Sequence, residues 1–331
     1  MKAVQYREYG GYERDQVVDL PESDYSEGEV LVGMRMVGVN PLDDTFRAGR
    51  IFLATAENLS RVGGQTGVGV VTDSAVRSFE PSERVFVASW GFRLPVDGTW
   101  CDYVTVPATA LTPMPAHIDD EHAAAFLAGA GYITGLLALT EFAAFKPGQT
   151  VLAPGIRGAV GMESVQVAPR LGASLAISTA STTAVTLHPS PAGYEHVIDL
   201  SQETLRDGVM RMTEGKGVDV IVDGVGGALT GEALGCLAAG GTYVVVGYAA
   251  GRDANINLTD IIWKAVNVGG FTLRAFAPET LAAQKTLLGY LSQGLIQPTV
   301  AKVFPITEAA GAVRHLVEAK PFGRVLMRVS D

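Results

Sequence analysis

The spacing of apolar and polar residues changes character once along the chain. Up to about residue 121, short β-type runs are separated by turn residues. Frequent short strands without long helical patterns are typical of a compact β-barrel. From about residue 122 onward, apolar strand-like runs alternate with segments of helical periodicity, which is typical of a doubly wound parallel sheet. The barrel-type runs cover residues 30–40, 68–76, 84–89 and 101–107.

The second half of the chain predicts individual elements. A glycine-containing turn follows its first strand, and the next helix is expected to end or kink at Pro169 because proline lacks a backbone N–H. Helices are expected up to Leu171 and at 230–238 and 280–293, and a further β run at 271–276. The predicted strands of the parallel sheet are 150–153, 174–178, 196–199, 218–223 and 242–247.

The amino-acid composition indicates the size of the core and excludes some classes of binding partner. The 331 residues are 47% hydrophobic and 18% charged, enough for two domains with large cores. The net charge of −10, without a basic run, argues against nucleic-acid binding and against an anionic membrane surface.

Two further features concern location. The only cysteines, Cys101 and Cys236, stand far apart, which indicates a reducing compartment. The first ten residues lack the apolar core of a signal peptide. Residues 123–140 are uncharged and reach the length of a membrane span, but their Ala and Gly content favours a buried helix. We therefore expect a cytoplasmic protein without a membrane partner.

The stretch VLAPGIRGAVG, residues 151–161, joins a predicted strand to a predicted helix. Glycines at this spacing allow a tight turn and close approach of backbone N–H groups to a pyrophosphate. The helix N-terminus adds partial positive charge. The pattern predicts dinucleotide binding through Gly155, Arg157, Gly158, Ala159, Val160 and Gly161.

The end of the second strand bears on the choice of cofactor. NAD-specific folds place an acid there, whereas residues 177–183 contain hydroxyl groups and no acid. This favours NADP, with Arg157 either a phosphate partner or a solvated loop residue. No lysine or arginine follows the strand, so NAD stays possible. The hydroxyl residues expected at the cofactor are Ser178, Thr179 and Ser181.

Six stretches of the chain carry a likeness to a known family. They are VGVNPLDDTFRAG (37–49), SERVFV (82–87), GTWCDYVTVPATALTPMP (98–115), FKPGQTVLAPGIRGAVG (145–161), GVDVIVDGVGG (217–227) and FGRVLMRV (322–329). Together they resemble the zinc-free quinone oxidoreductase branch of the medium-chain dehydrogenase/reductase family. The resemblance implies a GroES-like catalytic barrel (1–121 and 269–331), a Rossmann cofactor domain (122–268), a homodimer, and reduction of a quinone or enone by NADPH.

The positions at which the chain departs from zinc-using relatives are as informative as the resemblance itself. Asn40 stands where those relatives have a cysteine ligand, and Gly64-Gln65-Thr66 stands where they have Gly-His-Glu. Two distant cysteines cannot form a structural zinc lobe, and the five histidines lack metal-ligand spacing. We therefore expect no zinc. In the glycine turn, Ile156 falls at the point of close backbone approach, which predicts an altered cofactor geometry.

Without a metal, the acceptor must be activated by conjugation, and the protein must position it and stabilise a developing oxyanion. Asn40 and Asp43 are the predicted catalytic residues. Asn40 could donate to the substrate oxygen, and Asp43 could order a water or pair with Arg47. The alternative for both is a turn cap at Asn-Pro. Trp90 and Phe92 are expected to line the substrate pocket together with Arg47, although either aromatic could be barrel core.

Other cofactor contacts come from strand ends and from the resemblance. Thr134 matches a threonine that contacts the nicotinamide side in the family, with an ordinary buried helix threonine as the alternative. The remaining expected cofactor residues are Gly226, Gly247, Tyr248 and Arg324. Two other functions stay open: an enoyl-thioester reductase, and a dinucleotide-binding protein with little catalysis. A tyrosine proton donor of the first kind is missing from residues 51–60.

Overall fold

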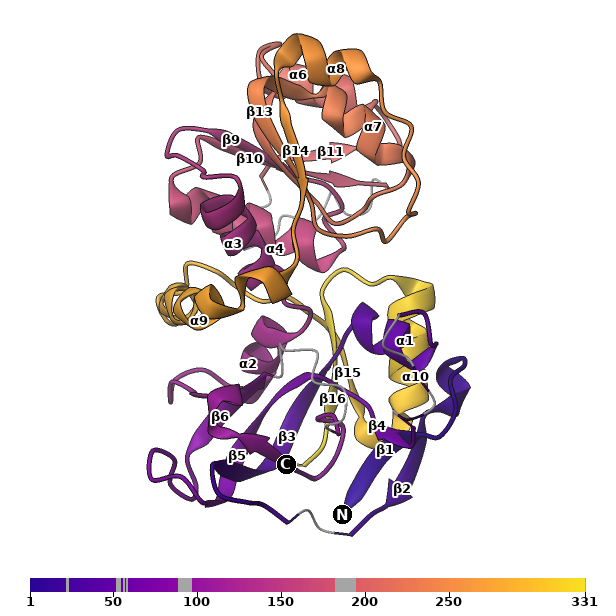
Figure 1. Ribbon diagram of the computed structural model, residues 1–331, viewed down its shortest axis with the longest axis vertical. Coiled ribbons are helices and arrows are strands. Elements are labelled where there is room, and N and C mark those ends of the chain that lie inside the picture. Colours follow the sequence, from indigo (N-terminus) through magenta and orange to yellow (C-terminus); the bar gives the residue numbers. More distant parts are fainter. Residues whose placement is uncertain are drawn as a thin grey trace. The chain divides into compact units, whose positions relative to one another are not determined.

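The computed structural model describes residues 1–21, 24–51, 55, 57, 59–88, 97–181 and 195–330. The chain forms two compact units (Figure 1). Unit 1 comprises Met1–Gly129 and Pro298–Asp331, and unit 2 comprises Ala130–Gln297.

Unit 1 is built on two sheets. The larger has the order β15-β16-β3-β5-β6-β8, with β7 also paired to β3, and the smaller has the order β2-β1-β4. Over residues 29–35 of β3 half-buried and buried side chains alternate, as expected for a strand with one face on the core, and residues 36–39 are all buried. The strands are β1 (Lys2–Tyr6), β2 (Gln16–Asp19), β3 (Glu29–Val39), β4 (Arg61–Val62), β5 (Thr66–Ser74), β6 (Arg84–Ala88), β7 (Tyr103–Pro107), β8 (Leu111–Pro113), β15 (Val300–Pro305) and β16 (Arg324–Arg328).

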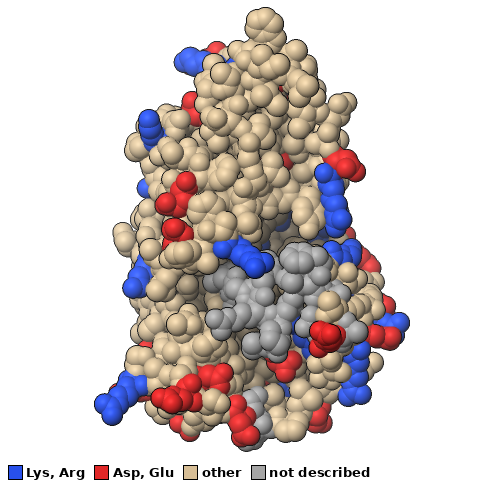
Figure 2. Space-filling model, viewed as in Figure 1, with Lys and Arg blue, Asp and Glu red and all other residues tan. Residues whose placement is uncertain are grey.

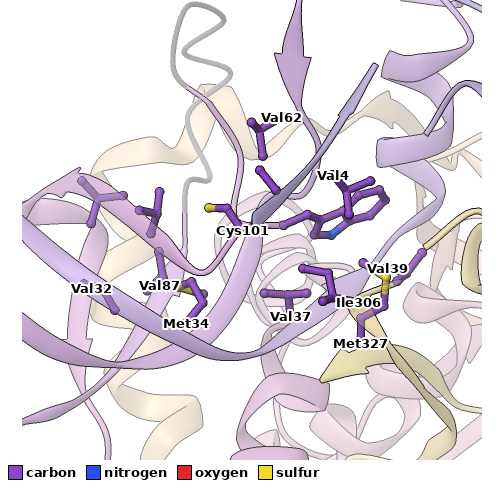
Figure 3. Close-up of a cluster of buried hydrophobic side chains, with 14 of the residues drawn as sticks. Val4, Val32, Met34, Val37, Val39, Val62, Val87, Cys101, Ile306 and Met327 are labelled. Carbon is purple, nitrogen blue, oxygen red and sulfur yellow. The ribbon is translucent and has the colours of Figure 1, made fainter. Parts of the chain in front are cut away.

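Valine, methionine and isoleucine side chains from strands and flanking segments fill the core of unit 1, as Figure 3 shows for Val37, Met34 and Ile306. Trp100 joins this core, and its indole N–H donates to the carbonyl of Gly38 at 3.0 Å. The α-helices in the described part of the unit are α1 (Pro41–Arg47), α2 (Asp120–Leu127) and α10 (Ala309–Arg314).

Unit 2 contains a six-stranded parallel sheet of order β11-β10-β9-β12-β13-β14. The chain starts at β9, winds outward to β11, and then returns to β12 on the other side of β9. Ligands bind at the carboxyl ends of strands where the winding reverses in this way. The strands are β9 (Thr150–Ala153), β10 (Leu175–Ala180), β11 (Val197–Asp199), β12 (Val218–Asp223), β13 (Leu237–Val245) and β14 (Asn267–Gly270).

The helices of unit 2 include α4, which follows the glycine turn and becomes a 3-10 turn (Ala168–Leu171) at Pro169, as the sequence predicts. A π-helical turn (Ala138–Phe142) continues α3. The α-helices are α3 (Gly131–Leu137), α4 (Ala159–Val167), α6 (Leu205–Met212), α7 (Ala228–Gly235), α8 (Leu258–Lys264) and α9 (Ala277–Ser292).

The predicted β run at 271–276 is wrong. The sheet takes residues 267–270 as β14, and Leu273–Phe276 forms a 3-10 turn. The rings of Phe271 and Phe276 stack across this turn with centroids 4.8 Å apart. A short apolar run does not reveal by periodicity whether its aromatics face a sheet or each other.

The unit boundaries also differ from the expected division at residues 121 and 268. Because β14 pairs with β13 and α9 packs against α3, the segment up to Gln297 belongs to unit 2. Helix α2 packs on β3 and β5 and therefore belongs to unit 1.

The uncharged run 123–140 does not form one helix. It is divided between α2 and the α3 segment, where most of its side chains are buried. Among the described residues no single helix has the length and apolar composition to cross a membrane, and only these two helices taken together reach them.

Candidate active site and nucleotide site

The glycine turn after β9 is tied to the neighbouring strand β10. Gly155 has a φ of +82°, a conformation that favours glycine. Its N–H donates to the Thr179 hydroxyl at 2.9 Å, and the N–H of Ile156 donates to the Thr179 carbonyl at 2.8 Å. A Cβ at Gly161 would lie 2.3 Å from the Gly155 carbonyl oxygen. The absence of a side chain at Gly161 therefore lets helix α4 sit directly on the turn.

The first turn of α4 presents backbone donors. The first intrahelical bond of the segment runs from the Met162 N–H to the Gly158 carbonyl at 2.9 Å. The N–H groups of Ala159, Val160 and Gly161 precede it and have no intrahelical acceptor. Such amides at a helix N-terminus form a site for an anion such as a pyrophosphate. The residues present thus fit a dinucleotide.

The Ile156 side chain points into the protein. It is 1% exposed and belongs to the core, whereas Arg157 and Gly158 are the exposed residues of the turn. The isoleucine therefore anchors the turn from inside, and its effect on the cofactor geometry stays a prediction. Arg157 stays available as a phosphate partner.

The hydroxyl residues of β10 divide into two kinds. Ser178 is buried and donates to the Ala153 carbonyl at 2.6 Å, and Thr179 is buried and accepts the Gly155 N–H. Both therefore brace the turn. Ser181 follows β10 and is exposed. Direct contact of the three residues with a cofactor stays a prediction.

Asp223, at the end of β12, organises the neighbouring turn, and the sequence analysis missed it. Its Oδ1 accepts the N–H groups of Val225 at 2.7 Å and Gly226 at 3.1 Å. Its Oδ2 accepts the hydroxyls of Thr230 at 2.9 Å and Tyr243 at 2.7 Å. The sequence signal for this residue was an acid, Asp223, at the end of an apolar strand and shortly before the glycine pair Gly226-Gly227.

This turn lies against the glycine turn of β9, because a Cβ at Gly155 would be 2.8 Å from the Val225 side chain. Gly247 donates its N–H to the Asp223 carbonyl at 3.1 Å. The structure thus brings the predicted residues Gly155, Gly226 and Gly247 to one edge of the sheet. Tyr248 follows, 58% exposed, with the Arg252 guanidinium 5.2 Å from its ring centre.

The two other expected cofactor residues are buried. Thr134 lies in α3, where its N–H donates to the Ala130 carbonyl at 2.9 Å. Arg324 begins β16 in unit 1, where its N–H donates to the Thr299 carbonyl at 2.7 Å. Their roles toward the nucleotide stay predictions.

In unit 1, a polar cluster forms where β3 ends and β5 begins. Asn40 caps helix α1, and its backbone N–H donates to Asp43 Oδ2 at 2.8 Å as part of a capping box. Gln65 Nε2 donates to Asp43 Oδ1 at 3.0 Å. Asn40 and Asp43 are buried, whereas Gln65 is half-buried. From the sequence alone, Gln65 stands out only as the residue in place of a zinc ligand.

The arrangement before Gln65 depends on a glycine. Gly64 has a φ of +91°, and a Cβ there would lie 2.3 Å from the indole of Trp100. The chain can therefore pass flat against the buried tryptophan and deliver Gln65 to Asp43.

Burial raises the pKa of Asp43 to about 6, and the hydrogen bonds from Gln65 and Asn40 and the charge of Arg61 limit the rise. Asp43 is thus a buried carboxyl whose two oxygens are both engaged. It can hold neighbouring donors in place, and its acceptors are directed inward.

Arg47 does not pair with Asp43 as expected. Its side chain is 2% exposed, forms ion pairs with Asp44 and, at 3.2 Å, with Asp15, and donates to the Gly10 carbonyl at 2.7 Å. Burial raises the pKa of Asp15 to about 7, although Arg47 opposes the rise. This enclosure argues against direct contact between Arg47 and a substrate.

Trp90 and Phe92, the predicted aromatic pocket residues, lie outside the described residues. The described ranges contain no group of three His, Cys, Asp or Glu side chains that could hold a metal ion. On the described part of the face shown in Figure 2, basic side chains are scattered among acidic and uncharged ones without a continuous basic patch.

Comparison with known proteins agrees with this geometry. Residues 26–116 match the alcohol dehydrogenase GroES-like domain, and residues 192–327 match the zinc-binding dehydrogenase family. A quinone oxidoreductase of Pseudomonas aeruginosa is 30% identical over 98% of this chain and 99% of its own length. The Mycobacterium tuberculosis mycoketide-CoA synthase is 28% identical over 96% of this chain and 7% of its own length.

Among solved structures, the Escherichia coli quinone oxidoreductase in complex with NADPH is similar, with a TM-score of 0.84 and 26% identity. The similarity covers 99% of this chain and all of that chain.

Proposed function

Because the chain belongs to the medium-chain dehydrogenase/reductase family, in its quinone oxidoreductase branch, we propose that it is an NADPH-dependent oxidoreductase that reduces a quinone or an α,β-unsaturated carbonyl. The carrying observation is the glycine turn of β9, with free amides at the start of α4 and its backbone bound to Thr179. The quinone oxidoreductase relatives supply the substrate class.

In this proposal the amides of Ala159, Val160 and Gly161 hold the pyrophosphate, and Arg157 holds the 2′-phosphate. The lack of an acid at the end of β10 favours NADP over NAD. Bound NADPH supplies a hydride to the acceptor. The hydrogen-bonded cluster of Asn40, Asp43 and Gln65 binds the acceptor in this proposal.

We propose that the reaction needs no zinc. Asn40 and Gln65 occupy the positions of two zinc ligands in the resemblance, and the structure uses them in a hydrogen-bonded cluster with Asp43. Amide groups are poor substitutes for the thiolate and imidazole ligands that zinc prefers. An acceptor activated by conjugation fits such a site.

Fluorescence titration with NADPH and NADH, followed by NADPH oxidation with quinones, enones and an enoyl-CoA thioester, tests the proposal. We expect tighter binding of NADPH than NADH and turnover with quinones or enones after dialysis against a chelator. Turnover confined to the enoyl thioester would favour the thioester reductase. Binding without turnover would favour a non-catalytic dinucleotide-binding protein.

We also propose that the protein is a homodimer. The described strand β14 ends the sheet of unit 2, and large apolar side chains are exposed on it and on α8: Leu258, Ile262, Trp263 and Val268. Trp263 is 83% exposed. An open strand edge beside apolar side chains suits pairing with a second copy about a twofold axis. Light scattering should give twice the mass of 34.7 kDa, and Trp263→Glu should lower it.

We propose a cytoplasmic location because the cysteines are not joined in a disulfide. Cys101 and Cys236 are both free and buried, and burial raises the pKa of each to about 12. Unpaired structural cysteines are typical of a reducing compartment.

A further inference from the structure

Gln65 is the member of the polar cluster that reaches the surface. It is half-buried, whereas Asn40 and Asp43 below it are buried. One N–H of its amide donates to Asp43 Oδ1 at 3.0 Å. A carboxamide nitrogen carries two hydrogens, so one donor is left for another acceptor.

Asp43 determines which end of that amide faces inward. An ionised carboxylate only accepts hydrogen bonds, so it selects the Gln65 nitrogen over the oxygen. Asp43 itself cannot turn away, because its Oδ2 accepts the Asn40 N–H at 2.8 Å and it lies in the first turn of α1. The backbone of Gly64 packs directly against Trp100 and so holds the main chain of the neighbouring Gln65 in place.

The geometry points to a role for Gln65 beyond the expected pair of Asn40 and Asp43. We propose that the second N–H of Gln65 donates to the carbonyl oxygen of the acceptor, and that Asp43 is the positioning residue that holds Gln65 in this orientation. This inference rests on the proposed function. A donor held in advance at a developing oxyanion lowers the barrier without reorganisation during the reaction.

The chemistry balances without a protein-derived proton or electron. A hydride transferred from the nicotinamide of NADPH would form a bond to the β-carbon of an enone, giving an enolate, or to a quinone oxygen, giving the hydroquinone monoanion, and NADP⁺ would be the other product. Water supplies the proton that completes the two-electron reduction. Gln65 contributes only a hydrogen bond to the oxygen while the charge develops, and keeps its own proton.

The test compares wild-type protein with Gln65→Met, which keeps the length of the side chain and removes the donor. Removing one oxyanion donor typically lowers kcat about 10²–10³-fold, and we expect a fall toward the lower end for a half-exposed site. The NADPH dissociation constant should stay within about twofold, because the hydrogen bonds described for the glycine turn run to Thr179 and within the turn, whereas Gln65 is bonded to Asp43. Gln16→Met, which makes the same change at an exposed glutamine on β2, is the matched control and should retain wild-type turnover.

Two readouts separate this role from a structural one. The loss in Gln65→Met should be larger for enones, whose enolates are basic, than for strongly oxidising quinones. Asp43→Asn can donate to the Gln65 oxygen and reverse the amide. It should therefore reduce kcat while the thermal midpoint and NADPH binding of a folded variant are retained.

The outcomes are distinct. Turnover by wild-type protein with equal turnover by Gln65→Met would overturn the role of Gln65 and leave the proposed function intact. An equal loss with enones and quinones would also overturn it. Absence of turnover by wild-type protein with bound NADPH would overturn the proposed function, and the inference with it.

Discussion

Gly161→Ala tests whether the contact between α4 and the glycine turn sets the nucleotide site. The added Cβ would lie 2.3 Å from the Gly155 carbonyl oxygen and 2.5 Å from that of Pro154. Carbon–oxygen contacts are ordinarily no shorter than about 3.3 Å, so α4 must move away by nearly 1 Å. Both opposing atoms are backbone, and no side-chain rotation relieves the contact.

The magnitude follows from two opposing effects. Overpacking of this kind costs about 1–3 kcal/mol, and alanine in a helix gains about 1 kcal/mol over glycine. We therefore expect a net loss of up to about 2 kcal/mol in the free energy of unfolding. Displacement of the α4 amides should weaken NADPH binding at least about tenfold, which corresponds to about 1.4 kcal/mol.

Urea denaturation and NADPH fluorescence titration measure the two effects. Gly289→Ala is the control, since it makes the same change inside helix α9 of the same unit, where the nearest atom is 3.9 Å away. That variant should be as stable as wild type or slightly more so and should bind NADPH normally. Wild-type affinity and stability in Gly161→Ala would refute the reasoning.

Three further predictions concern buried polar groups. Thr179→Val removes the acceptor of the Gly155 N–H and should cost about 1–3 kcal/mol of stability and reduce NADPH affinity, whereas Thr179→Ser should restore both; equal behaviour of the two variants in urea denaturation would contradict this. Asp223→Ala leaves four donors unpaired and should cost roughly 3–5 kcal/mol; a loss below about 1 kcal/mol would show that the network is dispensable. The pKa of Asp15 is raised from 3.8 to about 7, so its contribution to stability is present below pH 3.8 and is lost as the pH rises through 7. The free energy of unfolding of Asp15→Asn should therefore fall less between pH 4 and 7, by up to about 1.4 kcal/mol per pH unit, and parallel pH profiles would contradict the assignment.

Local pattern was sufficient for much of the fold. The change from β-type runs to strand–helix alternation is a property of neighbouring residues, and it predicted the sheets of unit 1 and the parallel sheet of unit 2. The glycine spacing at 155–161 likewise predicted the turn, because backbone conformation and close approach depend on those residues themselves. The prediction for 271–276 was wrong because a short apolar run does not by itself distinguish a strand from the 3-10 turn, with Phe271 stacked on Phe276, that the structure shows.

The candidate site depended more on tertiary structure. Asn40 and Asp43 could be found together because they share one helix turn, but Gln65 reaches Asp43 across 22 residues through the register of β3 with β5. From its place in the sequence, Arg47 could be an unpaired cation near the site. The tertiary structure instead buries it in an ion pair with Asp15.

The sequence by itself therefore determined most of the helices and strands, the conformation of the glycine turn and the lack of the usual zinc-ligand residues. The tertiary structure decided which polar side chains are buried and paired within the protein, such as Arg47, and which are partly exposed with a second N–H, such as Gln65. The physical reason is that burial and pairing of a side chain depend on residues that are distant along the chain, and strand register brings those residues together.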